Sequence, residues 1–508
     1  CRWWTVDELM KQVILEKNVV KLSNACLQED FSNISKPLYD RSKLSAGIVH
    51  IGLGNFHRAH QAWYIHQLMQ RGEALNWAIV GAGIRNYDVE QRKKMLAQDF
   101  LTTLIELDPK GQSAEIIGPM IDYVPIVDGN SELIARMAKS DIRIVSLTVT
   151  EGGYFIDASS SLLDVSHPDI EHDAKCPDTP KTVFGAMIAA LKVRRQRGFG
   201  PFTCQSCDNL QGNGRILRRT LVSLAGLSDP ELAEWIDKKC SFPNSMVDCI
   251  VPATGPLELE LVKRLGIDDE VPVTHENFRQ WVIEDDFCSG RPDWEKVEVT
   301  MSSDVHLYES MKIQILNAGH QILANFGEIV GLSTIDECMQ NDEIVSFFNH
   351  VQRCEIVPHV AEVPGMKPQN YVELVADRFA NSKIKDTVRR VAFDGAARHS
   401  GFVHPTIRAA LSSNELISGL ALTEAMWARM CYGIREDGSV IEANDPHWGF
   451  LTSCAKRAKE NPILWIDETN FYGDIAESHL FRTEFSMQLA YIWEHGVSSA
   501  IKSFLSDL

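Results

Sequence analysis

The chain has 508 residues, of which 44% are hydrophobic and 23% are charged, and its formal net charge is −19 at pH 7. This length exceeds what one hydrophobic core usually supports and predicts two or three domains of roughly 150 residues each. The acidic residues are spread along the chain, no basic block occurs, and no apolar run reaches the roughly 18 residues that cross a bilayer, so neither nucleic acid nor a membrane is an expected partner.

Residues 1–45 are expected to form an N-terminal extension and lead-in. Their sequence begins CRWWTVDELMKQVILEKNVVKL and lacks the basic start and uninterrupted apolar core of a secretory signal. The 12 cysteines of the chain are scattered without a framework spacing, which is typical of reduced thiols. We therefore expect a cytoplasmic protein.

Residues 46–298 alternate short β-rich runs with helical stretches, which is typical of βαβ units and a largely parallel sheet. The clearest predicted strands are 46–54, 76–83, 141–153 and 200–210, and the clearest predicted helices are 61–72, 131–140 and 180–198. We predict an α/β, Rossmann-type dinucleotide-binding domain over 46–298.

The segment GLGNFHRAH, residues 52–60, follows the first predicted strand and begins like the glycine loop of a dinucleotide-binding fold. In such a loop the first glycine permits a tight turn, the second lets a diphosphate approach the backbone, and the third relieves helix–strand packing. Gly52 and Gly54 occupy the first two places and His57 occupies the third. Since anions bind there to backbone N–H groups and the positive end of the following helix, His57 would change packing without removing anion binding. The alternative is an α/β protein with two turn glycines and no cofactor.

The choice of cofactor depends on the second predicted strand, which should end beside the adenosine ribose. A carboxylate there accepts hydrogen bonds from the 2′-hydroxyl and repels a 2′-phosphate. Asp88 is the candidate, although it lies farther from Gly54 than is usual, and nearby Arg85 could instead accommodate a phosphate. We therefore expect NAD, with NADP as the less favoured cofactor.

The CQSC motif is the one stretch with a metal or redox spacing, at Cys204 and Cys207. A structural zinc site needs a second pair, which does not follow, and a redox pair should open a helix. We interpret both cysteines as small buried residues of a strand and expect no metal site.

Residues 299–508 no longer alternate strand and helix patterns, and they predict a mostly helical second domain. Long segments with helical periodicity dominate it, at 308–331, 420–434 and 482–496. The first of these segments contains YESMK, in which Tyr308 and Lys312 have the spacing of short-chain dehydrogenases. Because those enzymes are about half this length and place the motif inside the nucleotide domain, we set that match aside.

The same segment carries Lys312, Asn317 and His320 in MKIQILNAGH. On an α-helix with about 100° per residue they lie at relative angles of about 0°, 140° and 80°, so all three can line one side of a pocket. A lysine in a dry site beside a positive nicotinamide ring can act as a base, while asparagine and histidine can donate hydrogen bonds to a developing alkoxide. An amphipathic helix with these polar residues facing solvent is the alternative.

Six segments together, in the same order, resemble the polyol-specific long-chain dehydrogenase/reductase family. They are GLGNFHRAHQAWY, SLTVTEGGY, SCDNL, FPNSMVD, RPDWEKV and MKIQILNAGH. The resemblance runs from about residue 45 to beyond residue 410. It implies a metal-independent, NAD-dependent oxidation of D-mannitol to D-fructose and the reverse reduction. The alternatives within the family are oxidation of D-arabinitol and reduction of the hexuronates fructuronate or tagaturonate.

The resemblance also implies roles for individual residues. Lys312 matches the general acid and base. The residues that match groups around the reacting oxygen or the proton path are Asn209, Asn317, His320, Glu151 and Glu309. The residues that match substrate ligands are Asp248, Arg390 and Arg398. The residues expected to bind or shape the cofactor site are Gly52, Gly54, Asn55, Phe56, His57, Arg58 and Asp88.

Two positions depart from the family pattern. Arg398 stands where a lysine is usual, and Cys249 follows Asp248 where an arginine is common. A guanidinium binds as a fork and an ammonium as a point, so the geometry around a substrate hydroxyl changes. The expected partner is a polyol or ketose substrate, and the expected assembly is a monomer or small homo-oligomer. The alternative from another functional class is a catalytically silent dinucleotide-binding protein.

Overall fold

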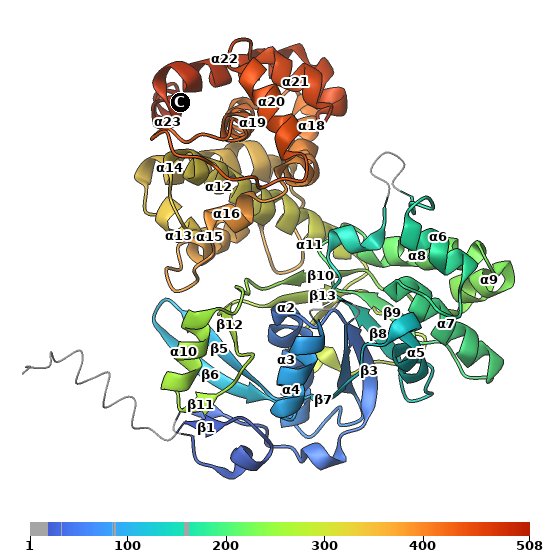
Figure 1. Ribbon diagram of the computed structural model, residues 1–508. Helices are drawn as coiled ribbons and strands as arrows, with labels where there is room; N and C mark the ends of the chain where they lie inside the picture. The colour runs from blue at the N-terminus through green and yellow to red at the C-terminus, as the bar shows by residue number, and fades with distance from the viewer. Residues whose placement is uncertain (1–18, 32, 84, 86–87, 157–161) are drawn as a thin grey trace, which may run out of the picture. The chain divides into compact units, whose positions relative to one another are not determined.

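The computed structural model describes residues 19–31, 33–83, 85, 88–156 and 162–508. The chain divides into two compact units, Cys1–His306 and Leu307–Leu508. Figure 1 labels helices and strands of both units where there is room. None of the helices in these ranges combines the length and hydropathy that spanning a membrane requires.

A parallel sheet of five strands, in the order β7-β4-β3-β8-β9, forms the centre of the first unit as far as it is described. Its strands are β3 (Ala46–Ile51), β4 (Ala78–Ala82), β7 (Met120–Tyr123), β8 (Ile144–Leu147) and β9 (Thr203–Ser206). The chain builds outward from β3 through β4 to β7 and then returns to place β8 on the other side of β3. The strand order therefore reverses between β3 and β8, and ligands of open α/β sheets bind outside the carboxyl ends of the strands at such a reversal.

Helices cover both faces of this sheet. Alternate residues of a strand point to opposite faces, so Val49 and Ile51 pack in the core formed with α5, α7 and α8, while Ile48 packs in the core formed with α3. The helices of the unit are α2 (Asn55–Ala59), α3 (Gln61–Gln70), α4 (Asp88–Ala97), α5 (Ser131–Met137), α6 (Pro168–Lys175), α7 (Val183–Gln196), α8 (Asn213–Gly226), α9 (Pro230–Lys239) and α10 (Pro256–Arg264). Burial on both faces explains why the strands read as nearly continuous apolar runs.

Shorter sheets, one of them built on an antiparallel hairpin, complete the first unit. Their strand orders are β12-β5-β6-β2, β10-β13-β14 and β1-β11. The strands are β1 (Val20–Lys21), β2 (Ile34–Ser35), β5 (Thr102–Asp108), β6 (Gly111–Ile117), β10 (Ser245–Asp248), β11 (Ile267–Asp268), β12 (Val273–Glu276), β13 (Gln280–Ile283) and β14 (Thr300–Met301). The hairpin of β5 and β6 was not among the predicted elements.

The second unit is helical. Its helices are α11 (Val305–Met311), whose first two residues still belong to the first unit, α12 (Ala318–Val330), α13 (Ile335–Cys338), α14 (Asp342–His350), α15 (Pro368–Phe379), α16 (Val388–Ala392), α17 (Gly395–Arg398), α18 (His404–Ser413), α19 (Ser418–Met430), α20 (Trp448–Ala458), α21 (Ile463–Thr469), α22 (His479–His495) and α23 (Val497–Ser506). Segments of π-helix join some of them, at η6 (Lys312–Asn317), η7 (Val351–Ile356) and η9 (His399–Val403). The prediction of a Rossmann-type sheet domain followed by a mostly helical domain is confirmed.

A buried polar cluster around Glu424 of α19 lies in the core of the second unit. The Glu424 carboxylate is hydrogen-bonded to His399 Nδ1 at 2.8 Å and to His404 Nε2 at 3.4 Å, and it accepts a hydrogen bond from Tyr472 Oη at 2.9 Å. Asn325 of α12 is hydrogen-bonded to the other ring nitrogen of His399 at 2.8 Å. The cluster therefore fixes η9 and α18 against α12 and α19 by directional contacts in an apolar interior.

Candidate active site

The glycine loop begins directly after β3, at Gly52. Its φ of +91° is one that residues with a side chain rarely adopt, and a Cβ added there would lie 2.1 Å from the carbonyl oxygen of Thr148. Thr148 Oγ1 in turn donates a hydrogen bond to the Gly52 carbonyl at 2.6 Å. The tight turn therefore requires glycine both for its conformation and because the backbone after β8 passes so close.

Gly54 has a different role. It precedes α2 with an extended conformation, and a Cβ added there would meet no atom within 4 Å. The bare backbone at Gly54 instead borders a cavity of about 450 Å³. This open approach is what a dinucleotide diphosphate needs at the second glycine of the loop.

The cavity lies where the strand order reverses. Its walls come from the carboxyl ends of β3 and β8, from the start of α4 and from the segment that leads into α7. Of the predicted cofactor residues, Gly52, Gly54 and Asp88 line it. Its size and position suit a ligand that lies across the end of the sheet.

Asp88 is the first residue of α4 and is 8% exposed. Its Oδ2 accepts a hydrogen bond from the backbone N–H of Arg85 at 2.9 Å, and its side chain packs on Gly83, where an added Cβ would lie 2.4 Å from the Asp88 Cβ. Arg85, whose side chain is exposed, lines the same cavity. The two residues between which the choice of NAD or NADP was left open thus stand side by side.

His57, in the place of the third glycine, faces the interior. Its ring stacks on His50 of β3 with centroids 3.4 Å apart, and neither of its ring nitrogens has a hydrogen-bond partner within the described part of the chain. Burial, with the neighbouring His50, lowers the pKa of His57 well below its usual value. A neutral imidazole stacked on the strand therefore takes over the helix–strand contact that glycine supplies elsewhere.

Asn55 and Arg58 also point away from the cavity. Asn55 Nδ2 donates to the carbonyl of Pro252 at 3.0 Å, and the Arg58 guanidinium donates to Asn55 Oδ1 at 2.7 Å and to the carbonyl of Val271. The ring of Phe56 stacks on His60 at 4.9 Å. Residues 55–58 do not line the cavity, so their effect on a cofactor stays a prediction that works through the position of α2.

Asp208, at the end of β9, is a residue that sequence reasoning missed. It is buried and accepts hydrogen bonds from the backbone N–H of Val149 at 3.1 Å and of Thr150 at 2.8 Å, and from Tyr154 Oη at 2.8 Å. It thereby ties the segment after β8, in which the backbone of Glu151 lies, to the end of β9. The exposed Asn209 follows immediately, so Asp208 sets where that residue emerges. A carboxylate at a strand end in SCDNL was the available signal.

Asp248 ends β10 and is buried, opposite Gln280 of the antiparallel strand β13. Cys249 beside it is also buried. Both belong to the first unit, on a sheet separate from the parallel one. The part of Asp248 in substrate binding stays a prediction.

Lys312 and Asn317 lie at the two ends of the π-helical segment η6. The angles expected from an α-helix are therefore wrong for this pair, because a π-helix closes its hydrogen bonds from residue i to i+5 and stacks those two residues on one face. His320 follows in the regular helix α12. The π segment brings the lysine and the asparagine closer in angle than the predicted 140°, and such segments occur often at functional sites.

All three side chains are buried rather than facing solvent. Asn317 Nδ2 and His320 Nε2 have no hydrogen-bond partner in the described structure. The His320 ring stacks on Phe379 at 4.1 Å, and burial lowers its pKa to about 3, so it is neutral at physiological pH. The alternative of an amphipathic helix with these residues in solvent is wrong. Buried donors without an acceptor are unusual, and they suit an oxygen atom of a ligand.

Asp386 was also missed from the sequence. Arg390 donates to both of its carboxylate oxygens, through Nε at 2.6 Å and Nη2 at 2.5 Å, and Asp386 Oδ2 lies 4.0 Å from His320 Nε2. Arg398 donates through Nη1 to the carbonyl of Val391 at 2.8 Å. In the second unit Arg390 is therefore held by a buried carboxylate and Arg398 by the backbone of α16, while His320 lies near that carboxylate without a hydrogen bond to it.

Glu309 and Tyr308 of α11 are both buried, one turn before Lys312. Cys204 and Cys207 are buried free thiols at β9 and just after it, and burial raises the pKa of each thiol. No group of three or more metal-ligating side chains occurs within the described residues.

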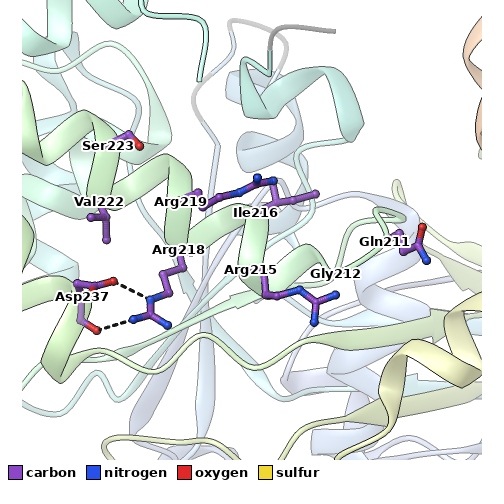
Figure 2. Close-up of a pocket in the computed structure, with 9 residues that line it drawn as sticks. All are labelled: Gln211, Gly212, Arg215, Ile216, Arg218, Arg219, Val222, Ser223 and Asp237. Carbon is purple, nitrogen blue, oxygen red and sulfur yellow. Dashed lines mark hydrogen bonds and ion pairs between the residues drawn. The ribbon is translucent and has the colours of Figure 1, made fainter. Parts of the chain in front are cut away.

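A second cavity of about 520 Å³ lies along α8 and α9 of the first unit (Figure 2). Figure 2 shows Arg218 joined to Asp237, with Nε and Oδ1 2.7 Å apart, while Arg215 and Arg219 extend away from this pair. None of the predicted site residues lines it. The cavity at the glycine loop is therefore the candidate cofactor site.

Two family profiles match the chain. The one described as "Mannitol dehydrogenase Rossmann domain" matches residues 46–296, and the one described as "Mannitol dehydrogenase C-terminal domain" matches residues 304–493. The chain belongs to the mannitol dehydrogenase family. It is an oxidoreductase of the dehydrogenase class, and the predicted resemblance is confirmed.

Relatives match over almost their whole length. The mannitol 2-dehydrogenase of Cereibacter sphaeroides is 47% identical over 474 residues, which is 93% of this chain and 99% of that protein. That of Emericella nidulans is 36% identical over 497 residues, covering 96% of this chain and 98% of that protein. The solved structure "Pseudomonas fluorescens mannitol 2-dehydrogenase ternary complex with NAD and D-mannitol" is 37% identical with a TM-score of 0.88, covering 96% of this chain and all of that one. A D-sorbitol dehydrogenase in substrate-free form is 31% identical with a TM-score of 0.85, covering 95% and 100%.

Proposed function

We propose that this enzyme catalyses the NAD-dependent oxidation of D-mannitol to D-fructose and the reverse reduction. The observation that carries the proposal is the group of buried polar residues Lys312, Asn317 and His320, in which two hydrogen-bond donors are unused. The similarity to the solved complex with NAD and D-mannitol supports the same assignment.

The residues of the first unit fit NAD. Gly52 makes the turn, Gly54 leaves open space, and Asp88 lines the same cavity, where we propose that it accepts a hydrogen bond from a ribose hydroxyl. NAD, when bound, supplies the acceptor for the hydride that leaves the carbinol carbon. Because Arg85 lines the same cavity, preference for NAD over NADP is part of the proposal and needs both cofactors to be compared.

Lys312 takes the hydroxyl proton at Nζ when the polyol is oxidised and returns it when the ketose is reduced. Asn317 and His320 donate hydrogen bonds to the reacting oxygen, which stabilises the negative charge that develops on it. His320 can do this with a neutral N–H because burial lowers its pKa to about 3. In this assignment the side chains polarise the oxygen and the reaction is metal-independent. Asn209, Glu151 and Glu309 keep the roles that the family resemblance implies.

Arg390 bears on the choice between a neutral polyol and a hexuronate. Its guanidinium is bound at two points by the Asp386 carboxylate, so its charge is already balanced. A carboxylate substrate would have to compete with this pair, whereas a hydroxyl group needs only the remaining N–H groups. This contact favours a neutral polyol such as D-mannitol over fructuronate or tagaturonate. Asp248 and Arg398 are the further hydroxyl ligands that we propose.

Steady-state turnover of D-mannitol, D-arabinitol, D-sorbitol and D-mannonate, each with NAD and with NADP, tests the substrate. We expect the highest kcat/KM with D-mannitol and NAD. A sugar acid as the preferred substrate would overturn the proposal. A preference for D-arabinitol would overturn D-mannitol as the substrate but leave the proposed oxidation mechanism in place.

Lys312→Ala tests the mechanism. Loss of the proton acceptor should lower kcat for mannitol oxidation by about 10² to 10⁴ near neutral pH, while NADH binding, measured by fluorescence, persists. Lys192→Ala is the matched control, because the Lys192 side chain on α7 is 34% exposed, pairs with Asp178 at 3.2 Å and lines neither cavity. Unchanged turnover in Lys312→Ala would remove the lysine from the mechanism.

A further inference from the structure

None of the residues considered so far balances the negative charge that a diphosphate would bring into the glycine-loop cavity. A dinucleotide diphosphate carries two negative charges, and the carboxylates Asp88 and Asp169 line the same cavity. The only cationic side chains among the described lining residues are Arg85 and Lys181. A diphosphate placed beside these acids needs a positive group close to it.

The loop itself supplies little positive charge. Arg58, its one arginine, is 2% exposed and directs its guanidinium to Asn55 and to the Val271 carbonyl. The helix that follows the loop, α2, has five residues and ends at Ala59, and the backbone of His60 after it is not helical. Since the macrodipole is a sum over aligned peptide units, a helix of this length contributes less than the long helix of a typical dinucleotide-binding fold.

Arg85 lies at the ribose end of the cavity. Its backbone N–H donates to Asp88 Oδ2 at 2.9 Å, which fixes the residue beside the carboxylate proposed for the ribose. Lys181 comes from another part of the wall, the segment that leads into α7. The two cations therefore serve different parts of an extended ligand.

Lys181 combines an anchored backbone with a displaceable head group. Its N–H donates to the buried Asp173 carboxylate at 2.7 Å, and the next residue, Thr182, donates to the same carboxylate through its N–H at 3.0 Å and its hydroxyl at 2.6 Å. The Lys181 side chain is 57% exposed, and its Nζ pairs with Asp169 at 3.8 Å. An ion pair between half-exposed groups at this distance contributes little stability and exchanges easily for a stronger anion.

We propose that Lys181 is the cationic ligand of the cofactor diphosphate and that its ammonium group leaves Asp169 for the diphosphate when the dinucleotide binds. This inference rests on the proposed function, because it takes the ligand of the cavity to be a dinucleotide. Lys181 then supplies the positive charge for the diphosphate that the side chains of the glycine loop do not supply.

Binding titrations of NADH, ADP and adenosine to the full-length protein test the proposal. In Lys181→Ala we expect the Kd of ADP and of NADH to rise about tenfold, the loss of one charge-assisted contact, while the Kd of adenosine stays unchanged. Lys181→Arg keeps the charge and should bind ADP within about threefold of the wild type. Thermal unfolding of each variant verifies that it is folded.

Asp169→Asn separates the proposal from a structural ion pair. If Lys181 serves the diphosphate, removing its competitor should leave ADP binding as tight as in the wild type or tighter; if the pair merely holds α6 and α7, both variants should weaken binding alike. Lys192→Ala should bind all three ligands as the wild type does. An unchanged ADP affinity in Lys181→Ala, or an equal loss for ADP and adenosine, would overturn the proposal.

The outcome is independent of the proposed substrate. Wild-type turnover of D-mannitol tests the proposed function, and the titrations need no turnover. An active wild type whose ADP affinity does not depend on Lys181 overturns the inference alone. Conversely, absence of mannitol turnover with the expected binding pattern overturns the substrate and leaves Lys181 as the diphosphate ligand.

Discussion

Replacing each glycine of the loop by alanine separates folding from cofactor binding. In Gly52→Ala the new Cβ must lie at a φ near +91° and 2.1 Å from the Thr148 carbonyl oxygen. A left-handed conformation costs an alanine about 1–2 kcal/mol, and relieving the clash requires a backbone shift of about 1 Å between the buried ends of β3 and β8. With overpacking costs of about 1–3 kcal/mol, we expect a total loss of about 2–5 kcal/mol in the free energy of unfolding.

Gly54→Ala is the matched variant, because its Cβ meets no protein atom within 4 Å and its φ of −92° suits any residue. We expect its free energy of unfolding to change by less than about 1 kcal/mol, the usual difference between glycine and alanine at a helix N-cap. The methyl group would instead occupy the approach to the backbone and weaken NADH binding about tenfold or more. Urea unfolding and NADH fluorescence titration measure the two effects. A Gly54→Ala protein that binds NADH like the wild type, or a Gly52→Ala protein of wild-type stability, would refute this division of roles.

Three further substitutions test other parts of the structure. Asp208→Asn should lower the free energy of unfolding by about 2–3 kcal/mol in urea denaturation, because an amide cannot accept all three of the hydrogen bonds that the carboxylate accepts; wild-type stability would contradict its role. Burial raises the pKa of Glu424, but His399 and His404 outweigh burial and hold this pKa below the ordinary value of about 4.3. The ionised carboxylate therefore adds to the free energy of unfolding above about pH 4.3, and this stabilisation is lost as the pH falls further. Glu424→Gln should therefore be less stable than the wild type by about 3 kcal/mol at pH 7, and this difference in the free energy of unfolding should shrink between pH 5 and pH 3 in urea unfolding. A difference that stays constant with pH would contradict the role of the ionised Glu424. His320→Gln should lower kcat about 100-fold without changing the shape of the pH–rate profile between pH 5 and 9, since the pKa of His320 is about 3, and loss of a pH limb in the variant would contradict that assignment.

The parts of the fold that could be predicted are those in which a residue's role depends on its near neighbours. The strand before Gly52, the turn and the helix after it form one local unit, so the spacing of apolar residues and glycines was enough. Lys312, Asn317 and His320 lie within nine residues of one another, and the sequence therefore indicated that they act together. The largely parallel character of the sheet followed from the alternation of strands and helices.

The parts that could not be predicted depend on distant partners or on small departures from regular geometry. Asp208 acts through Val149 and Thr150, some 60 residues earlier, and nothing in its own neighbourhood marks these partners. In the sequence Lys181 is indistinguishable from an ordinary surface lysine, and only the structure shows that it lines the same cavity as the glycine loop. The π segment spans six residues, too few to disturb a periodicity that is read over a long apolar helix.

The π segment at Lys312–Asn317 makes the number of residues, as well as their identity, part of the design of the site. A π turn holds one residue more than an α turn, so deleting Gln314 would leave a continuous helix with every named side chain still present. Lys312 would then stand four positions before Asn317, about 40° away around an α-helix, and would keep its face. Deleting a second residue would leave no extra residue to absorb the loss, so Lys312 would rotate by about 100° relative to α12 and leave that face. Chain length is thus a constraint that no single substitution reveals, and an insertion or deletion scan across these six residues would measure it.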